Sequence, residues 1–140
     1  MLETGQFPIS RIKISPPIRR PEIVSRPRLI DRLYDEFDQK LILVVAPAGY
    51  GKTTLLLDLA STRDIAICWL TLDSLDQEPQ RFLNYLVSSI HYRFPDFGRE
   101  SLAALEGMVS LEADGERLLI AITNEIRPGI FEHFVLILDD

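Results

Sequence analysis

The sequence lacks the features of a secreted or membrane-bound protein. It contains one cysteine, Cys68, so no disulfide can form within the chain, and we expect a buried, inert thiol in a reducing compartment. No apolar run approaches the roughly 20 residues that cross a bilayer. The N-terminus has no charged segment followed by an apolar one, as a signal peptide would have. We therefore expect a cytoplasmic protein without a membrane partner.

An excess of positive charge is also missing. The 140 residues carry a net charge of −6, which argues against direct nucleic-acid binding by this chain. Residues 1–28 are the exception, because six basic residues against two acids give them a net charge of +4. Within them, residues 1–22 hold four prolines and are expected to form an extended basic arm. A solvated arm is the simpler interpretation, and contact with an acidic partner or with nucleotide phosphates is the alternative.

The most informative stretch is residues 45–54, VAPAGYGKTT. An apolar run precedes it and Leu55-Leu56-Leu57 follows, which predicts a strand, a glycine-bearing turn and a helix. Gly49 and Gly51 allow backbone angles that side chains resist, so main-chain amides can approach a phosphate. The stretch predicts a P-loop, with Lys52 reaching the β- and γ-phosphates and the Thr53 hydroxyl holding Mg²⁺.

One position departs from the usual P-loop pattern, because Ala46 stands where the first glycine is common. An ordinary strand-to-helix turn with a surface lysine is the alternative interpretation. The predicted nucleotide-binding residues of the loop are Ala46, Pro47, Ala48, Gly49, Tyr50, Gly51, Lys52, Thr53 and Thr54.

An acidic pair, Asp139-Asp140, follows the apolar run FVLIL at residues 134–138. Ligands of open α/β sheets bind at the carboxyl ends of the strands, so the pair predicts a Walker B element. Asp139 is expected to steady Mg²⁺ together with Thr53, and Asp140 to orient or deprotonate an attacking water. Lys52, Asp139 and Asp140 are thus the predicted catalytic residues. A polar strand terminus is the alternative for the two acids.

Hydrophobic periodicity predicts alternating strands and helices. Strands are expected at residues 41–46, 65–72 and 134–138, and helices at 25–39, 53–61, 79–94 and from 114 to 128, with a short one around 102–105. Ser25 and Asp76 are expected as helix N-caps. The last long helix is expected to place Leu118, Leu119, Ile122 and Ile126 on one face. The fold class is α/β, a three-layer αβα P-loop NTPase with a parallel sheet.

Four stretches together resemble one family. They are VSRPRLIDRL, APAGYGKTTLL, CWLTLDSLDQEPQRFLNYL and FVLILDD. Over residues 16–140 the chain is similar to the nucleotide-binding domain of the MalT-like, LuxR-type ATP-dependent transcriptional activators, which are signal-transducing ATPases with numerous domains (STAND) related to AAA proteins. Residues 23–140 are then the N-terminal part of a P-loop ATPase domain, truncated after the Walker B strand.

The resemblance implies an ATP-dependent switch in a longer parent protein. An ADP-bound resting form would give way to an ATP-bound, self-associating form when an inducer binds elsewhere. A C-terminal helix-turn-helix, missing from this chain, would then bind DNA. The resemblance also implies that Arg26 and Arg28 lie near the nucleotide, that the ligands are ATP or ADP with Mg²⁺, and that the parent is a Mg²⁺-dependent ATPase.

Two other functions fit the same residues. The chain can bind nucleotide without turnover, because the residues that complete hydrolysis lie outside it. It can also belong to a P-loop enzyme such as a small-molecule kinase, although no arginine-rich lid segment follows residues 65–72.

Overall fold

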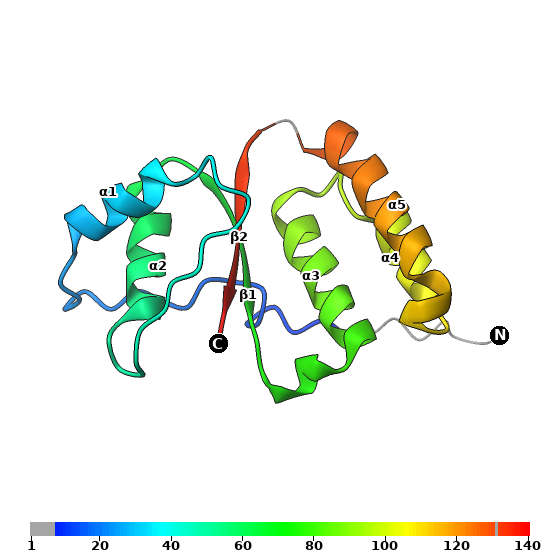
Figure 1. Ribbon diagram of the computed structural model, residues 1–140, viewed down its shortest axis with the longest axis horizontal. Helices are drawn as coiled ribbons and strands as arrows, with labels where there is room; N and C mark the ends of the chain where they lie inside the picture. Colours follow the sequence, from blue (N-terminus) through cyan, green and yellow to red (C-terminus); the bar gives the residue numbers. More distant parts are fainter. Residues whose placement is uncertain (1–7, 131) are drawn as a thin grey trace. The chain divides into compact units, whose positions relative to one another are not determined.

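The computed structural model describes residues 8–130 and 132–140, which are divided between two units (Figure 1). The first unit contains the described residues of Met1–Pro16 and Ala66–Asp140, and the second contains Pro17–Ile65. The chain therefore leaves the first unit after Pro16 and returns to it at Ala66. Within the described ranges, no helix has both the length and the apolar character needed to cross a bilayer.

The first unit is built on a parallel pair of strands, β1 (Ala66–Thr71) and β2 (Phe134–Asp139). Ala66 pairs with Phe134 at one end and Thr71 with Asp139 at the other, so the two carboxyl ends meet at one edge. Beyond the register, the Leu72 amide donates to the Asp139 carbonyl at 2.6 Å. The two strands confirm a mixed α/β architecture, while the larger three-layer sheet stays a prediction.

The strand predicted at residues 41–46 does not form, and this expectation was wrong. The segment is irregular, and the side chains of Leu41, Leu43 and Val45 are exposed by 75%, 77% and 87%. Val44, which alternates with them, packs against the core of the second unit. An apolar run becomes a strand only where a neighbouring backbone supplies ladder hydrogen bonds, and hydrophobic pattern cannot report that neighbour.

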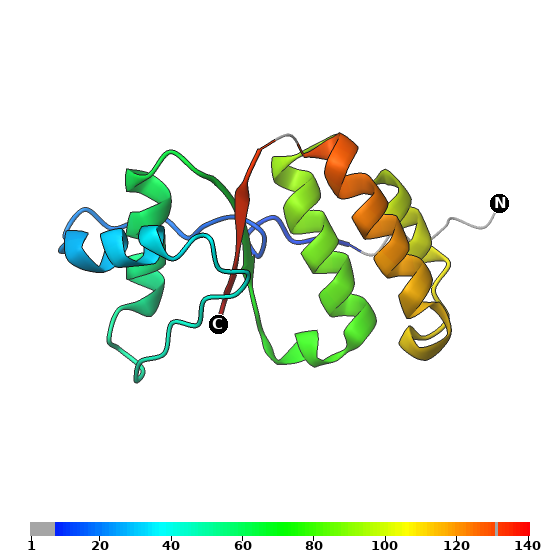
Figure 2. The same ribbon diagram turned by 45° about the horizontal axis from the view of Figure 1, so that its top comes forward.

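Three helices of the first unit follow β1: α3 (Pro79–Arg93), α4 (Arg99–Glu106) and α5 (Leu111–Gly129). In both views α3 lies between the strands and the α4–α5 pair (Figure 1, Figure 2). The core between them includes Cys68, Val87, Ile90, Phe97, Leu105 and Leu118. Burial raises the pKa of the Cys68 thiol to about 12, so the expected inert thiol is confirmed.

Two details of these helices differ from the predictions. Glu78, and not Asp76, caps α3, because its carboxylate accepts the amides of Gln80 and Arg81. Asp76 instead closes a short 3₁₀ turn, η1 (Ser74–Gln77). In α5, Leu118 is buried but Leu119 and Ile126 are exposed, so the predicted apolar face is buried only in part.

The second unit pairs α1 (Pro27–Asp35) with α2 (Lys52–Thr62). Ile30, Leu55 and Leu59 form its small core, and Pro27 occupies the first helical turn as expected. Ser25 was wrongly predicted as the α1 N-cap, since Arg26 holds that position without a side-chain bond. The Ser25 hydroxyl donates to the buried Asp58 carboxylate at 2.6 Å instead.

Glu125 of α5 caps α4 from outside that helix. Its carboxylate accepts the Glu100 amide at 2.7 Å, the Ser101 amide at 3.0 Å and the Ser101 hydroxyl. Burial alone would raise the pKa of Glu125, but the hydrogen bonds from Ser101, Glu100 and Gly98 outweigh burial and lower it. The folded protein therefore stabilises the ionised carboxylate of Glu125.

We expect Glu125→Gln to lower the free energy of unfolding by about 2 kcal/mol at pH 7, because its NH₂ group would face amide donors. The folded-state pKa is lowered, so the wild-type advantage is complete above the ordinary pKa of about 4.3 and is lost as pH falls through the folded value. Urea unfolding from pH 7 to pH 3 measures this. Glu116→Gln, at an exposed position of the same helix, is the control and should change stability by less than about 0.5 kcal/mol. An equal loss in both variants would contradict the capping role.

Candidate functional site: a glycine-bearing loop at the start of α2

The loop before α2 has the backbone geometry that the sequence predicts. Gly49 and Gly51 have φ angles of +84° and +78°, in the left-handed region that glycine tolerates best. Within the loop, the Tyr50 amide donates a hydrogen bond to the Pro47 carbonyl at 3.3 Å. The chain thereby turns within a few residues and leads directly into the first turn of α2.

The N-terminus of α2 has no side-chain cap. Gly51 is the N-cap residue, and its carbonyl accepts the Leu55 amide at 2.9 Å. Amides of a helix's first turn have no partner within the helix, and the helix dipole adds positive potential there. The start of α2 is thus suited to an anion.

Lys52 folds back over the loop. Its ammonium nitrogen donates to the Ala46 carbonyl at 2.6 Å, and the side chain is half-buried. An ammonium has three donors, so this bond leaves capacity for a further acceptor. Thr53 and Thr54 are half-buried in the same helical turn, while Pro47, Ala48 and Tyr50 are exposed.

Arg26 binds the same loop from the start of α1. Its guanidinium donates to the Gly51 carbonyl at 2.8 Å and to the Tyr50 carbonyl at 3.3 Å. Arg28, predicted beside it, is exposed on α1. The structure therefore brings Arg26 to the loop and leaves Arg28 on the helix surface.

An open pocket of about 450 Å³ lies against the loop. Five predicted residues line it, namely Arg26, Gly49, Tyr50, Gly51 and Thr54. Ile23 and Val24 supply an apolar wall that the sequence interpretation did not include. Their apolar character just before a basic helix start was the signal that could have indicated them.

Asp58 anchors the segment that carries Arg26. It is 2% exposed within α2, and its carboxylate accepts the Arg19 guanidinium at 3.0 Å and the Ser25 hydroxyl at 2.6 Å. These bonds tie residues 19–25 to α2, so they fix where Arg26 begins α1. An acid within the apolar run LLLDLA was a visible signal of a buried partner, and it was missed.

The predicted acidic pair lies in the first unit, whereas the loop lies in the second. Asp139 is 6% exposed at the carboxyl end of β2, in register with Thr71, and Asp140 is exposed. Asp139 is therefore held by the sheet at the edge where the strand ends meet, and its role toward the loop stays a prediction.

No protein-family model matches the chain. Curated relatives do, and the three reported below are named HTH-type transcriptional regulator MalT. The chain is 31% identical to the protein of Klebsiella pneumoniae subsp. pneumoniae and 32% to that of Serratia proteamaculans, each over 130 residues, or 91% of the chain and 14% of the relative. It is 40% identical to the protein of Cronobacter sakazakii over 78 residues, 56% of the chain and 8% of the relative. The predicted resemblance to MalT-like regulators is thereby confirmed for a region that spans 8–14% of their length.

The two loop glycines allow a matched test of the Arg26 contact. Alanine at either position adopts a left-handed φ at a cost of about 1–2 kcal/mol. A Cβ at Gly51 would lie 2.9 Å from the Arg26 guanidinium, whereas a Cβ at Gly49 meets nothing within 4 Å. We expect Gly51→Ala to destabilise the protein by about 1 kcal/mol more than Gly49→Ala in urea unfolding, because Arg26 must shift. The difference should vanish when Arg26→Ala is also present. A difference that persists without Arg26 would exclude this contact as its cause.

Proposed function

We propose that this chain, which is similar to part of the MalT transcriptional regulators, is the nucleotide-binding region of a signal-responsive transcriptional activator. It binds ATP and ADP with Mg²⁺ and hydrolyses ATP slowly. The observation that carries the proposal is the joint placement of Lys52, Arg26 and the uncapped start of α2 around one glycine-bearing loop. Anion-directed amides, an ammonium and an adjoining pocket are what a nucleotide requires.

Each residue has a specific role in this proposal. Loop amides and Lys52 bind the phosphates, and Thr53 ligates the metal. Mg²⁺ keeps several waters and binds phosphates, so it needs few protein ligands, and Asp139 serves as its acidic one. Asp140 orients the attacking water. The pocket beside Ile23 and Val24 suits the apolar faces of the nucleotide.

The switch itself belongs to the longer parent. There we propose a cytoplasmic, STAND- and AAA-related ATPase of the LuxR type that self-associates in its ATP-bound form. DNA contact is made through a helix-turn-helix outside this chain, because the chain's charge of −6 disfavours direct binding.

Binding without turnover is the second candidate, and one observation favours it. The loop, Lys52 and Arg26 all belong to the second unit, while both acids assigned to hydrolysis belong to the first. The residues proposed to bind phosphate thus lie in one unit and those proposed to complete hydrolysis in the other. A metabolic kinase differs from both, because its phosphate release would rise when an acceptor is added.

Lys52→Ala is expected to weaken ATP and ADP binding by about tenfold to a hundredfold, since a charge-assisted hydrogen bond contributes about 1.5–3 kcal/mol. Isothermal titration calorimetry with each nucleotide measures the loss. Lys40→Ala removes the same charge from an exposed position of the same unit and should leave affinity within about twofold. Equal affinity in wild type and Lys52→Ala would exclude a phosphate site at this loop.

Asp139→Asn is expected to reduce the ATP hydrolysis rate by about a hundredfold while changing ADP affinity less than about threefold, because its role is on the metal side. Phosphate release at saturating Mg²⁺ and ATP, compared with ADP titration, separates the two effects. Asp96→Asn, an exposed acid of the same unit, is the control. A parallel loss of binding and hydrolysis would argue against the assigned role, and a wild type that binds without hydrolysing would favour the second candidate.

A further inference from the structure

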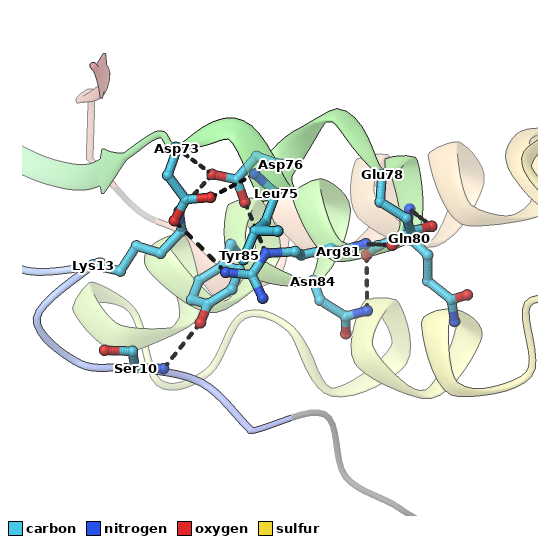
Figure 3. A network of polar contacts seen from close by, with 10 residues as sticks. All are labelled: Ser10, Lys13, Asp73, Leu75, Asp76, Glu78, Gln80, Arg81, Asn84 and Tyr85. Carbon is cyan, nitrogen blue, oxygen red and sulfur yellow. Dashed lines mark hydrogen bonds and ion pairs between the residues drawn. The ribbon is translucent and has the colours of Figure 1, made fainter.

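The segment formed by residues 9–15, here called the strap, is docked on the first unit. It contains no helix or strand, yet Ile14 is 5% exposed and packs against Leu70 and Tyr85. The Ser10 amide donates to the Tyr85 hydroxyl at 3.3 Å (Figure 3). The strap thus contributes to the core where β1 ends.

Lys13 is the polar centre of this docking. Its ammonium lies 2.8 Å from the Asp73 carboxylate, also contacts Asp76, and lies 5.0 Å from the centre of the Tyr85 ring. Figure 3 shows the side chain reaching from the strap to the turn that follows β1. Lys13 is 8% exposed, so it is almost fully withdrawn from water.

The charges around Lys13 are balanced. Asp73 and Asp76 form a capping box on η1, in which the Asp73 amide donates to Asp76 and the Leu75 amide donates to Asp73, each at 2.8 Å. Arg81 pairs with both acids, at 3.7 Å and 3.4 Å. Two cations therefore face two carboxylates, and removing one cation leaves an excess negative charge beside Asp76, whose side chain is 4% exposed.

Burial would lower the pKa of Lys13, but the hydrogen bonds to Asp73 and Asp76 outweigh burial and raise it. The hydrogen bond from Lys13 likewise lowers the pKa of Asp73. Both directions mean that the charged pair is the bound state near neutral pH, so the strap is held by charge as well as by Ile14.

Backbone bonds connect Lys13 to the predicted acid of β2. The Thr71 amide donates to the Lys13 carbonyl at 2.8 Å, and the next amide, Leu72, donates to the Asp139 carbonyl at 2.6 Å. Successive residues of an extended chain point their amides to opposite sides, so one dipeptide joins the strap to the end of β2.

We propose that Lys13 is a positioning residue for Asp139, acting through the strap and the Thr71-Leu72 dipeptide. Strand ends open more easily than strand centres, and the strap opposes that opening where Asp139 must hold a fixed place. Its catalytic consequence rests on the function proposed above, whereas its structural part does not.

Residue-resolved amide hydrogen exchange tests the structural part without any ligand. Lys13→Met keeps the apolar stem and removes the charge. We expect the Leu72 amide to exchange at least about tenfold faster in this variant. Arg11→Met removes an exposed charge from the same strap and should leave the rate within about twofold. Lys13→Met combined with Asp76→Asn restores charge balance and should recover part of the protection.

Equal Leu72 exchange in Lys13→Met and Arg11→Met would overturn the proposal. If Lys13→Met does not fold, Asp73→Asn tests the same contact by its effect on the exchange rate of the Leu72 amide. We expect a smaller effect, because the Asp73 side chain is 47% exposed and only one acid is neutralised. In that variant, an increase in the exchange rate over wild type that is larger at Leu72 than at core amides of α3 supports the proposal. An unchanged rate at Leu72 refutes it.

Hydrolysis measurements test the catalytic part. In Lys13→Met we expect a lower rate and about tenfold more Mg²⁺ for half-maximal rate, with Mg²⁺-free ADP affinity within about twofold of wild type. A general loss of folding would instead lower ADP affinity as well, and would refute positioning. If the wild type binds no nucleotide, the proposed function fails, and the exchange experiment alone decides whether Lys13 holds the strand end.

Discussion

The pairing of β1 with β2 is the interaction on which the first unit depends. It joins residues more than sixty positions apart and fixes their register from Ala66–Phe134 to Thr71–Asp139. In a strand, a shift by one residue turns every side chain to the other face. Such a shift would separate Cys68 and Leu70, which are 1% and 0% exposed, from their packing partners and would displace Asp139 from the edge. Burial of β1 against α3 thus sets the position of an acid that lies far from it in sequence.

The second unit is organised differently, by one buried acid more than by an apolar core. Its core is small, and α1 has only one buried residue, Ile30. Asp58 compensates by binding Arg19 and Ser25, which fastens the segment leading to Arg26. A buried carboxylate without such donors would be strongly destabilising, so the segment and the helix require each other. The position of Arg26 at the loop follows from that mutual requirement.

Local signals were sufficient for much of the fold and for the loop of the candidate site. The hydrophobic periodicity of residues 79–94 predicted α3, and Gly49 and Gly51 adopt the left-handed angles that the motif demands. Two of the errors share a physical cause, which is dependence on a distant partner. Residues 41–46 form no strand because no neighbouring backbone pairs with them, and Ser25 caps no helix because Asp58 competes for its hydroxyl. A role of Asp139 at the loop likewise depends on two segments that are distant in sequence, and local patterns in either segment do not report it.

Residues 1–28 carry a net charge of +4, but two of their basic side chains form ion pairs within the protein. Lys13 is paired with Asp76, whose side chain is 4% exposed, and Arg19 with Asp58, whose side chain is 3% exposed. The two cations moreover belong to different units, since the boundary falls between Pro16 and Pro17. Ion pairs so withdrawn from water are weakly screened and hold their geometry, unlike a solvated basic arm. Lys13 and Arg19 therefore each anchor their own segment, one within each unit.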